Sequence, residues 1–297
     1  MPELLSLCIP TYNRNSYLTE LLESIAQQVA ADALDGQDLG IYVSDNASTD
    51  GTRLTVEMFR PYLPGLQYFC NESNIGGNNN ILLCGRLGSG LYRWIIGDDE
   101  LINPGALAYI LTILRREEPV LFLNNDGRYD SKLRLPLVFR NYRELALASI
   151  EVHNPHLLIA HSLITANIFR STAYDSNFAQ TMINTNYGHM YGLVKGITIN
   201  SGPIFLPDMA TITVRQVRAG AESPNPLADL SDQWLNYIRW LEEYLELPGL
   251  ESAYVKQMAP SPRKEVWRKF TSTARKFVPR AIRHKLRGLV TKIDQEL

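Results

Sequence analysis

The chain has 297 residues and a net charge of −2, and its 45% hydrophobic content is enough to bury a large core in one domain or two small ones. It contains no run of about 18 apolar residues and no basic-then-apolar start, so we expect neither a membrane span nor export, and we place the protein in the cytoplasm. Cys8, Cys70 and Cys84 lie in apolar patterns without CxxC spacing, which predicts buried thiols and no zinc site or disulfide.

The first half of the chain repeats one order of elements: strand, polar loop, helix. Residues 4–9 are an apolar run that ends at a turn, and apolar residues at helical spacing over 18–29 predict a helix. The residues that could cap this helix are Asn13, Asn15 and Ser16. Residues 39–44 predict a second buried strand, and the polar loop 45–51 leads into a short helix over 52–60.

The next unit has a loop rich in asparagine. Residues 66–70 predict a third strand, and the loop over 71–80 holds five asparagines and two glycines. Side-chain amides and glycine backbone suit close contacts with a polar ligand, whereas the plain alternative is a loop and a helix start. Residues 81–87 predict the helix that follows.

One apolar run then continues directly into three consecutive carboxylates. A buried strand over 91–96 would place Asp98 and Asp99 at its C-terminal end, where open α/β sheets bind ligands. Mutual repulsion would raise the pKa values of such a cluster, so a divalent cation is its natural partner. The alternative is ordinary capping of a helix that begins near Pro104, a role that we expect of Glu100.

Strands and helices continue to alternate, with a helix predicted over 107–114 and a strand over 120–123. This order implies an α/β fold with right-handed parallel crossovers, which gathers the polar loops at one sheet edge. No GxGxxG follows the first strand and no GxxxxGK[ST] occurs, which argues against a Rossmann dehydrogenase and a P-loop protein. The elements predicted further on are strands over 162–170 and 210–217, a helix that starts within 185–193 and a helix over 234–245.

The C-terminal segment is strongly basic. After a Pro-containing boundary at 259–262, residues 263–293 hold eleven Lys or Arg against Glu265 alone, which leaves residues 1–262 with a net charge of −10. Apolar residues interleave with these cations at spacings near three and four, which predicts an amphipathic helix that Pro279 kinks or divides. Such a helix suits an anionic membrane surface. Packing on the acidic body and dimerisation are the alternatives, and nucleic acid is disfavoured because the body offers no basic face.

Four stretches, taken together and in this order, resemble the family-2 glycosyltransferases of GT-A fold. They are Ile9–Arg14 (IPTYNR), Val43–Thr52 (VSDNASTDGT), Asn74–Asn78 (NIGGN) and Gly97–Leu107 (GDDELINPGAL). A looser similarity extends to bacterial enzymes that build O-antigen, capsule or exopolysaccharide, including abequosyltransferase-like members. The resemblance covers residues 4–125.

This resemblance implies a Rossmann-like, mixed and mainly parallel sheet flanked by helices. The chain would divide into a nucleotide-sugar-binding half (1–125), an acceptor-binding half (126–258) and a helical tail (259–297). It would transfer a hexosyl or deoxyhexosyl group, with inversion, from a UDP, dTDP, CDP or GDP sugar to a lipid-linked saccharide, using Mg²⁺ or Mn²⁺. It would work as a peripheral protein on the inner face of the plasma membrane. The alternative is a catalytically inactive, sugar-nucleotide-binding scaffold.

The resemblance also implies roles for single residues. Asp98 would bind the metal and the diphosphate, Asp99 would lie beside them in the catalytic site, and Asp45 would contact the base. The other residues expected to bind the nucleotide sugar are Pro10, Thr11, Tyr12, Asn13, Asn74, Gly76 and Asn79.

The sequence departs from the family pattern at three places. Ile96 stands at the first aspartate of the DxD motif, Asn79 stands near a common arginine, and no Glu-Asp pair precedes the predicted helix of the acceptor half. His189 occupies the position of that pair and is our candidate for the catalytic base, since histidine has an unperturbed pKa of about 6.5. A hydrogen-bonding structural histidine is the alternative, and Asp175 and Asp208 are weaker substitutes.

Overall fold

The computed structural model describes residues 2–127, 134–151, 157, 164–185, 187–214 and 232–258. The chain divides into two compact units, Met1–Ala253 and Tyr254–Leu297, and the division falls within helix α11 (Leu250–Met258). The predicted boundary at 259–262 and the predicted basic helix lie outside the described residues. Among the residues described, no helix is both long enough and apolar enough to cross a bilayer.

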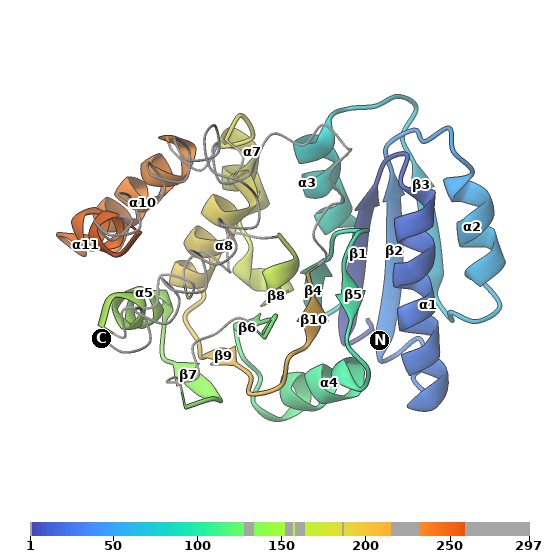
Figure 1. Cartoon of the computed structure of the whole chain (residues 1–297), viewed down its shortest axis with the longest axis horizontal. Helices are drawn as coiled ribbons and strands as arrows, with labels where there is room; N and C mark the ends of the chain where they lie inside the picture. The colour runs from blue at the N-terminus through green and yellow to red at the C-terminus, as the bar shows by residue number, and fades with distance from the viewer. Residues whose placement is uncertain are drawn as a thin grey trace, which may run out of the picture. The chain divides into compact units, whose positions relative to one another are not determined.

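An eight-stranded mixed sheet forms the centre of the first unit (Figure 1). In spatial order the strands are β3 (Leu66–Cys70), β2 (Leu39–Asp45), β1 (Leu5–Thr11), β4 (Tyr92–Ile95), β8 (Asn167–Arg170), β6 (Leu121–Leu123), β9 (Ile204–Leu206) and β7 (Leu137–Phe139). Strands β1, β2, β3 and β4 pair in parallel, β8 runs antiparallel between β4 and β6, and β7 is antiparallel to β9. The predicted α/β class with a mainly parallel sheet flanked by helices is confirmed.

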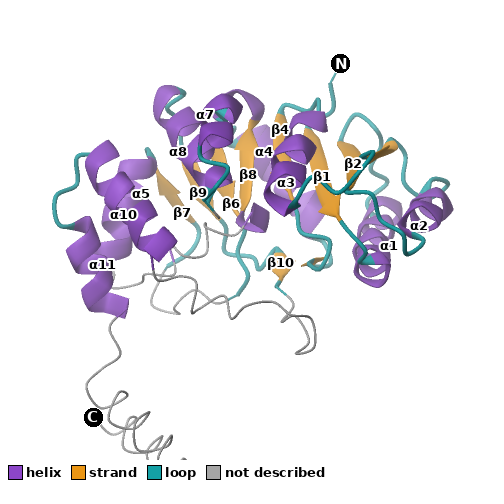
Figure 2. Ribbon diagram, turned by 90° about the horizontal axis from the view of Figure 1, so that it is seen from above, coloured by secondary structure: helices purple, strands orange, loops and turns teal. Residues whose placement is uncertain are grey.

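Both faces of the central strands are covered by helices, as the view from above in Figure 2 shows. Alternate residues of β1 share one buried cluster with apolar residues of helix α1 (Asn15–Ala31) and helix α4 (Ala106–Arg116). On the other face, helix α3 (Gly77–Leu87) approaches closely, because a Cβ on Gly85 would lie 2.8 Å from Ile95 Cδ1. Burial on both faces explains why the strands read as continuous apolar runs.

Aromatic rings join two helices in the second half of the unit. Rings of helix α10 (Asp232–Tyr244) pack against Tyr191 of helix α8 (Gly188–Ile199), with the Tyr191 centroid 4.7 Å from that of Trp240 and the two ring planes tilted. The other α-helices of the described residues are α2 (Thr52–Phe59), α5 (Tyr142–Glu151) and α7 (Ser176–Thr181). The predicted helices over 52–60 and 234–245 are confirmed as α2 and α10.

Two predicted strands are shorter than expected. The alternating stretch 162–170 forms a 3-10 turn (Ile164–Ala166) before the four-residue β8, and 162 and 163 lie outside the described residues. Of the stretch 210–217 the structure describes 210–214, which contain β10 (Ile212–Thr213); this strand pairs with β5 (Leu101–Ile102) in a separate two-stranded sheet. Alternation of apolar and polar residues therefore did not by itself identify which residues pair with a neighbouring strand.

Three local predictions are also wrong. Helix α1 has Arg14 at its N-cap without a side-chain cap, so none of the predicted capping residues has that role. Glu100 does not cap a helix, because β5 follows it and α4 starts only after Gly105. Cys8 and Cys84 are buried as predicted, but Cys70 is exposed because it ends β3, which pairs only with β2.

Candidate functional site

Polar loops follow the carboxyl ends of the four parallel strands β1 to β4, and the loops are tied to one another. The backbone N–H of Asn46 donates to Thr11 O at 2.9 Å, and the backbone N–H of Asn71 donates to Asp45 O at 2.9 Å. Parallel strands end at the same sheet edge, so these loops line one site, where α/β sheets usually bind ligands. The expected gathering of the loops at a single edge is seen in Figure 1.

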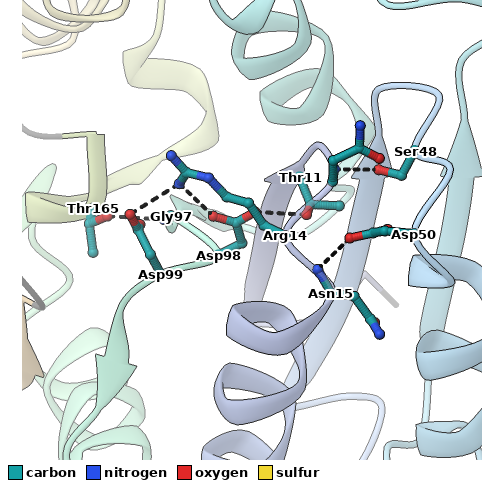
Figure 3. A network of polar contacts seen from close by, with 10 residues as sticks. Thr11, Arg14, Asn15, Ser48, Asp50, Gly97, Asp98, Asp99 and Thr165 are labelled. Atoms are coloured by element: carbon teal, nitrogen blue, oxygen red, sulfur yellow. Dashed lines mark hydrogen bonds and ion pairs between the residues drawn. The ribbon is translucent and has the colours of Figure 1, made fainter. Parts of the chain in front are cut away.

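Asp98 and Asp99 share one cation, the guanidinium of Arg14 (Figure 3). Arg14 Nη1 lies 3.1 Å from Asp98 Oδ1 and 3.0 Å from Asp99 Oδ2. The Thr11 hydroxyl donates to Asp98 Oδ2 at 2.7 Å, so both oxygens of Asp98 accept a hydrogen bond. The Asp98 side chain is 4% exposed and that of Arg14 is 44% exposed, which places the arginine on the solvent side of the pair.

Burial dominates the protonation of Asp98. It raises the pKa of Asp98 to about 6, against the lowering effects of the Thr11 hydroxyl and the Arg14 guanidinium, while the Asp99 carboxylate adds to the rise. For Arg14, burial lowers the pKa, but the two carboxylates outweigh it and the pKa is raised overall. At neutral pH the site therefore holds an ionised, buried carboxylate that favours a bound cation.

The acidic loop is fixed by hydrogen bonds to Thr165, a residue distant in the sequence. The Gly97 amide donates to Thr165 Oγ1 at 3.0 Å, and Trp94 Nε1 donates to Thr165 O at 2.8 Å. Asn124 Nδ2 donates to the same carbonyl at 2.9 Å, and all of these groups are buried or partly buried. Thr165 thus positions the backbone from which the two carboxylates project.

Gly97→Ala should disturb the carboxylates without unfolding the chain. A Cβ at Gly97 would lie 2.9 Å from Asp99 Oδ1, so the flexible carboxylate must move away. For the transfer reaction that the family resemblance implies, we expect about a tenfold loss of rate, because small displacements of positioning groups are costly. The measurement is initial-rate kinetics beside a thermal unfolding curve. Gly36→Ala is the control, since a Cβ there meets nothing within 4 Å; equal rates for the two variants would contradict the assignment.

Asp45 is deeply buried and already engaged. Its Oδ1 accepts from the Ser48 amide at 2.8 Å and its Oδ2 accepts from the Tyr68 hydroxyl at 2.5 Å. Burial and the bond to Asp45 raise the pKa of the Tyr68 phenol, which stays protonated. In this structure Asp45 stabilises its own loop through these two bonds. A nucleobase that donates to Asp45 would replace the Ser48 N–H or the Tyr68 hydroxyl, or would share an oxygen with it.

The asparagine-rich loop forms a network of amides. Asn46 joins it by donating to Asn74 Oδ1 at 2.8 Å and accepting from Asn71 Nδ2 at 3.0 Å, while Asn71 also donates to Asn80. Gly76 is the N-cap of α3 and has φ 86°, a conformation that residues with a side chain rarely adopt. Asn79 is exposed and donates to Ile75 O at 2.9 Å.

The first loop packs against the second. The backbone N–H of Asn13 donates to Ser48 Oγ at 2.8 Å, and the side-chain oxygen Oδ1 of Asn13 accepts from the backbone N–H of Thr49 at 2.8 Å. Pro10 is half-buried at the end of β1, whereas Tyr12 is 43% exposed. An exposed aromatic ring at this edge is available for stacking on a planar ligand.

His189 lies in the first turn of α8 and faces the start of α3. The two share a small pocket whose lining residues are Asn78, Ile81, Leu82, Ile183, Thr185, Gly188 and His189. Asn78 Nδ2 donates to Ile183 O at 3.3 Å across it. Of the weaker substitutes, Asp175 caps α7 and pairs with Lys195, and Asp208 accepts from the Tyr109 hydroxyl.

The donor set fits a divalent cation only in part. Two adjacent carboxylates offer the hard oxygen ligands that Mg²⁺ and Mn²⁺ take, and diphosphate oxygens and water can complete such a shell. Within the described ranges no group of three or more His, Cys, Asp or Glu could hold a metal, and Ile96 is fully buried and supplies no ligand. A metal at Asp98 would also have to displace Arg14.

Sequence reasoning missed two residues of this site. Arg14 belongs to the IPTYNR stretch, but its ion pairs join positions 84 and 85 residues apart, which no local pattern reveals. Thr165 lies 68 residues from Gly97 in a stretch predicted as strand. The sequence signal that could have pointed to Arg14 is its position as a basic residue in the polar loop after β1.

Comparison with known proteins agrees with this geometry. Residues 6–178 match the family described as Glycosyl transferase family 2. The chain is 36% identical over 154 residues to the abequosyltransferase RfbV of Salmonella typhimurium, covering 52% of this chain and 40% of that protein. It is 32% identical over 112 residues to the GalNAc(5)-diNAcBac-PP-undecaprenol beta-1,3-glucosyltransferase of Campylobacter jejuni, covering 37% and 34%. The matches thus span less than half of these relatives.

Solved structures share the fold at low sequence identity. S. aureus TarS 1-349 in complex with UDP-GlcNAc superposes with a TM-score of 0.57 at 17% identity, covering 86% of this chain and 72% of that one. The mannosyltransferase PcManGT from Pyrobaculum calidifontis in complex with GDP-Man and Mn²⁺ gives 0.54 at 14% identity, covering 92% and 81%. Similarity at this level shows a common GT-A fold.

Proposed function

We propose, from the premise that the chain belongs to glycosyl transferase family 2, that it transfers a sugar from a nucleotide diphosphate sugar to a saccharide hydroxyl in polysaccharide synthesis. The observation that carries this proposal is the Asp98, Asp99 and Arg14 cluster at the carboxyl edge of the parallel strands. Relatives named as an abequosyltransferase and a glucosyltransferase support the substrate class.

The donor would lie across the loops of this edge. Asp98 would hold Mg²⁺ or Mn²⁺ and, through it, the diphosphate, with Asp99 toward the donor sugar. The metal supplies positive charge where the departing diphosphate becomes more negative. The residues proposed for the base, ribose and sugar are Pro10, Thr11, Tyr12, Asn13, Asp45, Asn74, Gly76 and Asn79.

Deprotonation of the acceptor hydroxyl is assigned to His189. A base on the face of the sugar opposite the leaving group takes the hydroxyl proton as the new bond forms, which inverts the anomeric carbon. His189 supports this role by its place in the pocket beside the first turn of α3, next to the asparagine-rich loop. Histidine is a common general base in enzymes that work near neutral pH.

The acceptor is proposed to be a lipid-linked saccharide. The name of the Campylobacter jejuni relative includes an undecaprenol diphosphate acceptor. The eleven basic residues over 263–293 would hold the enzyme at an anionic membrane surface, on its cytoplasmic side, where such acceptors are anchored.

Deleting residues 263–297 should abolish sedimentation with anionic vesicles. Each cation near such a surface contributes on the order of 1 kcal/mol, so losing eleven removes the attraction. Sedimentation with vesicles of phosphatidylserine and phosphatidylcholine measures this, with pure phosphatidylcholine as the control. Unchanged sedimentation of the shortened chain would reject the membrane proposal.

The test of function is a donor screen followed by a turnover assay. UDP, GDP, dTDP and CDP sugars, each with Mn²⁺, are added singly, and the matching donor should raise the melting temperature by mass action. The protein should then hydrolyse that donor slowly, or transfer its sugar to a lipid-linked saccharide, only when Mn²⁺ or Mg²⁺ is present. Donor binding without turnover across all acceptors would favour the inactive scaffold instead.

A further inference from the structure

We propose that Arg14 is an internal counter-ion that couples entry of the divalent cation to entry of the diphosphate; this inference rests on the proposed function. Arg14 Nη1 contacts both carboxylates of the acidic pair, 3.1 Å from Asp98 and 3.0 Å from Asp99. Nη1 thus lies where a cation shared by these two side chains would lie. A metal and this guanidinium therefore compete for the same carboxylate oxygens.

The charges explain why neither ligand enters easily alone. Two carboxylates and one guanidinium leave one negative charge, which repels a diphosphate. A divalent cation alone must displace Arg14 from both carboxylates and leave the guanidinium beside it without an anionic partner, and like charges at this distance repel. The donor-free site therefore disfavours the metal, and the metal-free site disfavours the donor.

Entry of both ligands together removes the conflict. Phosphate oxygens are acceptors that match the planar fork of a guanidinium, so Arg14 can exchange its carboxylates for the diphosphate while the metal takes the carboxylates. The geometry permits this exchange, because the Arg14 side chain is 44% exposed and extends from the N-cap position of α1. Asp98 stays in place, because the Thr11 hydroxyl donates to its other oxygen, Oδ2. Each ligand thus improves the site for the other.

Arg14→Gln separates this role from a structural one. Removing the competing cation should tighten Mn²⁺ binding to the donor-free protein about tenfold, within the range of such couplings. The same variant should reduce the factor by which a nucleoside diphosphate strengthens Mn²⁺ binding. Electron paramagnetic resonance of free Mn²⁺ measures both, with UDP, GDP, CDP and dTDP tested singly.

A matched control and a conservative variant complete the design. Arg60→Gln removes an arginine that is 43% exposed and paired with Glu57 at 2.7 Å, outside the candidate site, and should leave Mn²⁺ affinity unchanged. Arg14→Lys keeps the charge and should bind Mn²⁺ within about threefold of the natural chain, since competition needs only the cation. A merely damaged fold would weaken binding in every variant.

Each outcome decides the proposal. Tighter donor-free Mn²⁺ binding by Arg14→Gln, with Arg60→Gln unchanged, supports it. Equal or weaker binding by Arg14→Gln, or no Mn²⁺ binding by either chain with any nucleotide, overturns it. If the Mn²⁺ result holds but no sugar is transferred, the proposed function fails while the counter-ion stands.

Discussion

Asp98→Asn is expected to lower sugar transfer about 10²- to 10³-fold, the usual consequence of removing one group that stabilises charge in a transition state. The amide can still accept the Thr11 hydroxyl bond of 2.7 Å, so the loop geometry is retained, but the charge that attracts the metal is lost. Initial rates at saturating Mn²⁺ and donor measure the effect. Asp38→Asn is the control, because Asp38 also pairs with an arginine, Arg115, away from the strand ends that carry the site.

The same substitution should make the metal-free chain more stable at neutral pH. Burial raises the pKa of Asp98 to about 6 in the folded state, above its unfolded value, so the native state holds the proton more tightly. The associated stability is present below about pH 4 and is lost as the pH rises through about 6. Above that pH the ionised side chain costs on the order of 3 kcal/mol, which asparagine avoids.

Denaturant unfolding in EDTA checks this expectation. The free energy of unfolding of Asp98→Asn should exceed that of the natural chain at pH 8, and the difference should shrink toward pH 4. A variant that is less stable at pH 8 would show that the ion pair with Arg14 outweighs the burial of Asp98. Loss of activity together with a gain in stability would mark Asp98 as kept for function.

His189→Gln is expected to lower kcat about 10²- to 10⁴-fold, the range for removing a general base. Donor affinity should stay unchanged, because His189 lies in the pocket beside α3, whose lining does not include Asp98, Asp99 or Arg14. Single-turnover kinetics with saturating donor measure the chemical step. Thr185→Val, in the lining of the same pocket, is the control for local packing. A loss below about threefold would transfer the role of base to another residue.

The first half of the fold could be predicted because its signals are local. Strands β1, β2 and β3 are runs of five to seven residues followed by polar loops, and their helices show clear apolar spacing. By contrast, β5 in the first half and β10 in the second have two residues each, too few for alternation to appear. The antiparallel insertion of β8 between β4 and β6 depends on pairing partners far apart in the chain.

The candidate site divides in the same way. The carboxylates and the asparagine loop were predicted because each follows directly after a strand, and the family resemblance is confirmed by the match over residues 6–178. The partners of those residues were not predictable, since Arg14 and Thr165 reach the acidic loop only through the folded sheet. Glu100 was predicted to cap a helix because β5, with two residues, gives no recognisable pattern in the sequence.

The bond between Thr165 and Gly97 bears on how such a protein could be recombined. A fragment that stops near residue 125 would keep both carboxylates but lose Thr165 and the strand β8 that pairs with β4. The parts of the chain before and after residue 125 are therefore not interchangeable, although the sequence resemblance ends near that point. A chimera built to change acceptor preference should take residues 164–170 from the same parent as the loop after β4. The acidic loop then keeps Thr165, which holds it, as well as its own ligand-binding residues.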